Sequence, residues 1–211
     1  MIKISLGKLE TARTNPALIA QSIFSQEGGK GGNPGFVGSW KTVVRSYHEN
    51  KETQSLAMNK LSEKFLITFN PTKENREKSA RFCDSFNNYC TEFTKLGLGI
   101  DTFQINLNWE ILKQSVLTGH SPFLCSNETH NIAYFFQERS NDWQNQLKYP
   151  LLQIYLSEKF YKCDVDKVKI GIYNIVDKKF ELKTYEDFEL DNSLEEAKTI
   201  FKNVKLEYDK F

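Results

Sequence analysis

Residues 103–138, FQINLNWEILKQSVLTGHSPFLCSNETHNIAYFFQE, carry the pattern that decides the fold. Apolar side chains occupy every second position over 103–109, which is the period of a β-strand with one buried face. Two more strands are expected over 114–125 and 131–138, with a polar turn between them. The stretch therefore predicts three consecutive strands of one sheet.

Helical patterns precede these strands. In the last of them Phe82, Phe86 and Tyr89 recur at three- and four-residue steps, which indicates one buried helix face. Pro16 is expected to break or bend the first helix. The expected helices cover 8–24, 37–50, 53–69 and 72–96, and the Gly-rich stretch 28–35 between the first two must be a loop.

A helix, a hairpin and a closing helix are expected after the strands. The helix covers 142–160, and Pro150 bends or divides it. The hairpin strands cover 167–176 and 179–185. The closing helix covers 193–208, starting with a capping box of Ser193 and Glu196.

The order of these elements from 72 to 176 is helix, strand, strand, strand, helix, strand. It predicts an α/β (α+β) fold in which a mixed central sheet of about five strands is flanked by helices. No internal repeat or long linker is visible, so residues 1–211 are expected to form a single domain. Residues 1–100 would be a mainly helical cap, and 101–211 the sheet core with the closing helix.

Composition limits the function classes. The chain has 28 basic and 27 acidic residues and a net charge of +1, so any nucleic-acid binding must be weak and local. No apolar run is long enough for a membrane span, and residues 1–10 do not resemble a signal peptide. The four cysteines form no C-x-x-C pair, which favours reduced thiols in a cytoplasmic protein and argues against zinc.

Three segments of the predicted core are LTGHSPFL (117–124), YFFQERS (134–140) and YPLLQIY (149–155). In order and spacing they resemble the second strand, the third strand and the following helix of the RecB/Cas4-like branch of the PD-(D/E)XK nuclease superfamily. The resemblance implies an α-β-β-β-α-β core. It also implies an active edge near which Gln153 would lie.

The positions that carry catalysis in that family are changed. By the resemblance, Pro122 replaces the first metal-binding Asp, Gln137 the second acid, and Arg139 the lysine. Proline offers no ligand, and a neutral amide oxygen binds a hard cation poorly. We therefore expect no catalytic residues, no bound metal and no other cofactor.

The alternative is an active, divergent DNA nuclease that uses Mg²⁺ or Mn²⁺ at a migrated site. Its ligands would be Glu110, Glu138 and His48. Glu138 is one residue out of register with the family position, so its side chain is expected on the opposite sheet face. Glu110 is explained more simply as a surface or strand-edge carboxylate, and His48 as a histidine on an exposed helix face.

A nuclease fold without its metal ligands is expected to act as a non-catalytic subunit. Family analogy suggests a multi-protein nucleic-acid-processing or phage-defence system, with a protein partner and no membrane. The stretch 28–35 and the neighbouring Phe36 and Trp40 are the expected docking surface.

Arg139 is the expected centre of any phosphate contact, because it lies on the same strand face as Gln137. Lys113, Lys148 and Gln153 would supplement it. The alternative is that Arg139 pairs with an acid such as Glu110 or Glu158 and contacts no ligand.

Overall fold

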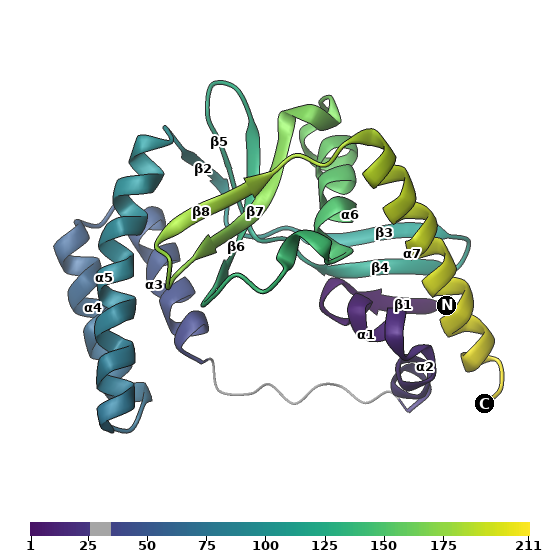
Figure 1. The fold of residues 1–211 in the computed structure, drawn as a ribbon, viewed down its shortest axis with the longest axis horizontal. Coiled ribbons are helices and arrows are strands. Elements are labelled where there is room, and N and C mark those ends of the chain that lie inside the picture. The colour runs from purple at the N-terminus through teal and green to yellow at the C-terminus, as the bar shows by residue number, and fades with distance from the viewer. Residues whose placement is uncertain (26–34) are drawn as a thin grey trace.

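The computed structural model describes residues 1–25 and 35–211, and within these ranges it has seven α-helices and two mixed β-sheets (Figure 1). The elements are β1 (Ile2–Ser5), α1 (Leu9–Thr14), α2 (Pro16–Phe24), α3 (Phe36–Glu49), α4 (Gln54–Thr68), α5 (Lys73–Lys95), β2 (Gly99–Thr102), β3 (Asn106–Leu112), β4 (Ser115–His120), β5 (Phe123–Ser126), β6 (Asn131–Gln137), α6 (Lys148–Tyr155), β7 (Val168–Asn174), β8 (Lys179–Lys183) and α7 (Asp187–Tyr208).

The larger sheet has the strand order β2-β5-β6-β7-β8. Strands β6 and β7 are parallel and are joined through α6, whereas the other pairs are antiparallel. Side chains alternate between two faces, so Tyr134 and Tyr173 pack with α3, α4 and α5. Ala133 and Ile172 pack on the other face, in a core that includes α6. Both faces are therefore buried.

The smaller sheet has the order β1-β4-β3, with β1 parallel and β3 antiparallel to β4. Its apolar side chains, including Ile4 and Leu117, share a core with α1, α2 and α7. Figure 1 shows α1 and α2 beside β1, and α7 running past the same sheet. The first and last helical segments thus complete one core.

The expectation of one sheet built from three consecutive strands is wrong. The segment expected as a single strand over 114–125 divides at Ser121 and Pro122 into β4 and β5, which belong to different sheets. Pro122 has no N–H for a ladder, and Gly119 has φ +145°, which a side chain would disfavour. Ser121 holds the crossing point, because its N–H donates to the carbonyl of Ile105 and its hydroxyl accepts from the Ile105 N–H.

The expected helices of the first half are confirmed within about two residues, including the break at Pro16. Thr53 and Thr72 cap α4 and α5 by accepting from backbone N–H groups. These helices do not form one cap, however. Helices α1 and α2 lie with the smaller sheet and α3 to α5 with the larger one (Figure 1). The two cores use different side chains, so each half of the cap follows its own sheet.

Two helix boundaries in the second half differ from expectation. Helix α6 starts at Lys148, so Pro150 lies in its first turn, where a missing N–H costs no hydrogen bond. Helix α7 starts at Asp187, with a capping box formed by Glu186 and Glu189. The hydroxyl of Ser193 instead donates to the Glu189 carbonyl within the helix. No helix in the described parts of the chain is both long and apolar enough to cross a membrane.

Candidate functional site

At the end of β6, successive side chains point to opposite faces of the larger sheet. Gln137 faces α6, and its Nε2 donates to the Tyr149 hydroxyl at 2.7 Å. Its Oε1 is buried and has no hydrogen-bond partner among the described residues. Glu138 faces the other way, toward α5, as the alternation along a strand requires. The two neighbours therefore have different environments.

The carboxylate of Glu138 is held by a lysine. Lys78 Nζ of α5 lies 2.7 Å from Glu138 Oε2, and both side chains are mostly buried. The same ammonium lies 5.1 Å from the ring centre of Phe36. A carboxylate that is paired and partly desolvated in this way is neutralised as a local charge.

A polar depression lies at the end of β6, between that strand and the start of α6. It has a volume of about 540 Å³ and is lined by Gln137, Glu138, Arg139, Asn141, Gln146 and Lys148. Neither Arg139 nor Lys148 lies in an ion pair within residues 1–25 and 35–211, whereas Glu138 does. The depression therefore holds two cations that form no ion pair within the described part of the chain.

Lys148 is held in place by aromatic rings. Its Nζ lies 5.1 Å from the centre of the Phe135 ring and 4.8 Å from that of Tyr149. Burial lowers the pKa of Lys148, and the carboxylate of Glu10 acts in the opposite direction. Together with the exposed guanidinium of Arg139, this ammonium provides donors for an anionic oxygen, such as that of a phosphate group.

Other residues expected at this edge lie elsewhere. Pro122 is buried at the crossing between the sheets. Lys113 is exposed in the turn between β3 and β4, because that hairpin belongs to the smaller sheet. Gln153 is fully buried, donates to the carbonyls of Val165 and Tyr185, and accepts from the Tyr185 N–H. Neither Lys113 nor Gln153 lines the depression.

The two acids and the histidine of the alternative metal site are also separated. Glu110 lies on β3 and accepts from the Gln114 N–H. Glu138 binds Lys78. His48 Nε2 lies 2.8 Å from the Tyr89 hydroxyl, and burial lowers its pKa to about 4. No group of three metal-ligating side chains occurs among the residues that the structure describes.

The expected docking surface at 28–35, Phe36 and Trp40 is not supported where it is described. Residues 28–34 lie outside the described residues. Trp40 has no exposed surface and donates to the Phe82 carbonyl, and Phe36 is 8% exposed. Large aromatic side chains next to a Gly-rich stretch are here part of the core beneath the larger sheet.

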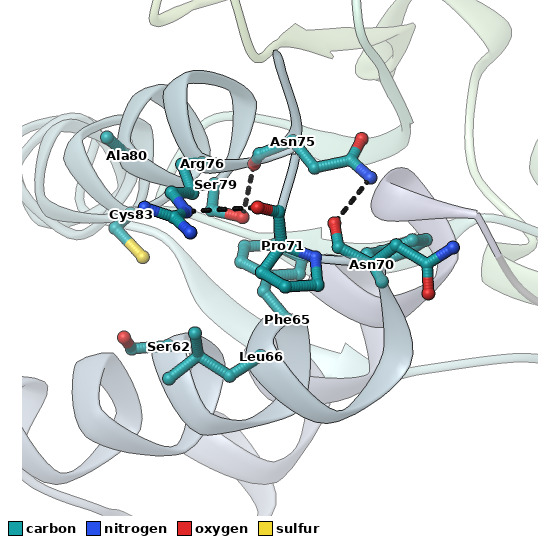
Figure 2. A pocket seen from close by; sticks show the side chains of 11 residues that line it. Ser62, Phe65, Leu66, Asn70, Pro71, Asn75, Arg76, Ser79, Ala80 and Cys83 are labelled. Carbon is teal, nitrogen blue, oxygen red and sulfur yellow. Dashed lines mark hydrogen bonds between the residues drawn. The ribbon is translucent and has the colours of Figure 1, made fainter. Parts of the chain in front are cut away.

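An apolar groove that the sequence reasoning missed lies between α4 and α5 (Figure 2). It has a volume of about 340 Å³. Arg76 crosses its end and donates from Nε to the Pro71 carbonyl at 3.2 Å. Leu66, on its wall, is 70% exposed, and the adjacent Ile67 is 86% exposed. The sequence contains a signal for this groove. Leu66 and Ile67 are apolar, but the buried face of α4 is already formed by Ala57, Leu61 and Phe65.

Comparison with known proteins gives no assignment: no family model matches the chain, and no curated protein is similar to it in sequence. The proposed function therefore depends on the geometry of the polar depression.

Proposed function

We propose that this chain is a non-catalytic subunit with a nuclease-like fold, which contacts a phosphate group of nucleic acid at the polar depression. The observation that carries the proposal is the pair of cations, Arg139 and Lys148, lining a depression whose one carboxylate, Glu138, is bound to Lys78. Two cations beside amide side chains provide charge-assisted donors for phosphate oxygens.

The arrangement of the larger sheet supports the nuclease-like part of the proposal. Taken in chain order, α5, β2, β5, β6, α6 and β7 follow the α-β-β-β-α-β order of the PD-(D/E)XK core. The hairpin of β3 and β4 is then an insertion that pairs with β1 in the second sheet. The depression lies at the end of β6, where the resemblance puts the active edge of that family.

The donor chemistry of the edge supports the non-catalytic part. By the resemblance, Pro122 and Gln137 replace two metal-binding acids; of these two residues only Gln137 lines the depression, and the one carboxylate there, Glu138, forms an ion pair with Lys78. Without two free carboxylates the edge lacks the charge that holds Mg²⁺ against phosphate. We infer that the chain works with a protein partner in a nucleic-acid-processing or phage-defence system, by analogy with the family it resembles.

Fluorescence anisotropy with a labelled single-stranded oligonucleotide, at low salt, tests the binding site. We expect wild type to bind and Arg139→Ala to bind several-fold more weakly, since one phosphate contact is lost. Lys113→Ala is the matched control, because it removes an exposed cation that does not line the depression. Superimposable curves for wild type and Arg139→Ala would refute the proposed site.

Incubation with DNA or RNA in Mg²⁺ or Mn²⁺ tests the absence of catalysis. We expect no cleavage by the purified protein, because the acids that position the metal are missing. Cleavage that is abolished by Glu138→Ala would instead establish the migrated-site nuclease.

A further inference from the structure

The wall of the depression includes the start of α6, where Gln146 and Lys148 lie. The first N–H groups of a helix have no partner within the helix and carry a partial positive charge. One of them, the N–H of Leu147, donates to Glu10 Oε1 at 2.7 Å. A carboxylate from α1, far away in the sequence, therefore caps the helix that borders the depression.

The charge of Glu10 also acts on Lys148, one of the two cations of the depression. The Glu10 carboxylate raises the pKa of Lys148 against the larger effect of burial, so the two charges are close enough to interact. Glu10 is itself only loosely compensated. Arg13 lies 3.5 Å from it and makes a closer contact, 2.6 Å, with Glu196 of α7.

We propose that Glu10 weakens phosphate binding at the depression, because its carboxylate is fixed at the N-terminus of α6 and offsets the charge of the adjacent Lys148. This inference rests on the proposed function, and it names the residue that limits affinity at the same site. A phosphate oxygen placed between Arg139 and Lys148 is repelled by Glu10 in proportion to the remaining carboxylate charge. The affinity for phosphate is then limited by a carboxylate of α1.

Glu10→Gln tests the proposal with little structural change. The Gln side chain has the same size and retains an oxygen that accepts from the Leu147 N–H, so the cap of α6 is kept while the charge is removed. With the same labelled oligonucleotide at low salt, we expect about three- to tenfold tighter binding than wild type, and a smaller gain at high salt.

Glu196→Gln is the matched control. It removes one negative charge from the other partner of Arg13, and the exposed fractions of the two acidic side chains are alike, 42% for Glu10 and 39% for Glu196. Glu196 lies on α7 and is not hydrogen-bonded to the start of α6. We expect Glu196→Gln to change the affinity less than Glu10→Gln does, because the Glu10 carboxylate stays in place, which separates a local effect from a change in net charge.

The outcomes distinguish the two proposals. Equal gains from Glu10→Gln and Glu196→Gln, or no gain from Glu10→Gln in a protein whose binding requires Arg139, overturn the inference and leave the proposed function intact. Identical binding by wild type and Arg139→Ala overturns the proposed function, and the inference falls with it. Melting curves of both Gln variants verify that the fold is retained.

Discussion

Acidification from about pH 7 to about pH 5 is expected to destabilise the fold through His48. The imidazole lies at the start of a buried chain of hydrogen bonds: Nε2 is 2.8 Å from the Tyr89 hydroxyl, which is 2.8 Å from the Tyr134 hydroxyl. Phe93 packs on the ring at a centroid distance of 4.6 Å. This surrounding favours the neutral imidazole, and burial lowers its pKa from 6.5 to about 4.

The sign and size of the effect follow from that difference. In the unfolded chain His48 takes up a proton as the pH falls below 6.5, whereas in the folded protein it stays neutral until the pH approaches 4. Its contribution to stability is therefore present above pH 6.5 and is lost as the pH falls toward 4. Protonation of His48 in the unfolded state alone lowers the free energy of unfolding by at most about 2 kcal/mol at about pH 5.

Urea denaturation at several pH values in this window measures the effect. Compared with His48→Gln, which does not titrate, wild type should lose stability more steeply on acidification. His120→Gln is the control, because His120 is exposed and bonds only polar neighbours such as Gln104. The comparison uses the slope of the free energy of unfolding against pH. A loss of stability that is the same at every pH in the variant therefore does not affect the result. Parallel pH profiles for wild type and His48→Gln would refute the reasoning.

Two further predictions concern the larger sheet and its helix. Gly171→Ala should prevent β7 and β8 from pairing, because a Cβ there would clash with the backbone carbonyl oxygen of Glu181. Gly99→Ala is the control, because the nearest atom to a Cβ at that position would be 4.0 Å away. Soluble yield and circular dichroism compare the two variants. Gln153→Leu should lower the free energy of unfolding by about 3 kcal/mol, because it leaves the buried N–H and carbonyl of Tyr185 without their Gln153 partners and removes one of the two donors to the Val165 carbonyl. An unchanged urea midpoint would contradict this.

The helices of the first half were predictable because local signals mark them. Pro16, the Thr caps and the aromatic spacing of α5 depend on residues within a few positions of one another. Sheet membership has no such local signal. Residues 115–120 and 123–126 both form strands, but β5 pairs with β6, the next strand in the chain, whereas β4 pairs with β1, which lies far away in the sequence.

The depression was predictable in part for the same reason. Alternation along one strand places Gln137 and Arg139 together, and Lys148 lies at the start of the next helix. Lys113 was misplaced because its hairpin joins the other sheet. The roles of Lys78 and Glu10 at this edge were not visible in the sequence, because each contact joins residues far apart in the chain, with separations of 60 and 137 residues.

The parallel pairing of β1 with β4 has a consequence for protein synthesis. Residues 2–5 leave the ribosome before their ladder partners, Ser115 to Thr118, which follow only after α5 has been made. Helix α2 likewise packs with α7, which begins at Asp187. The apolar side chains of β1 and α2 therefore reach their native partners only after most of the intervening chain has been synthesised. Helices α3 to α5 follow one another in the chain and can pack together without this delay. The core that contains them is therefore expected to begin forming before the core that contains α1 and α2, although α1 and α2 come first in the sequence.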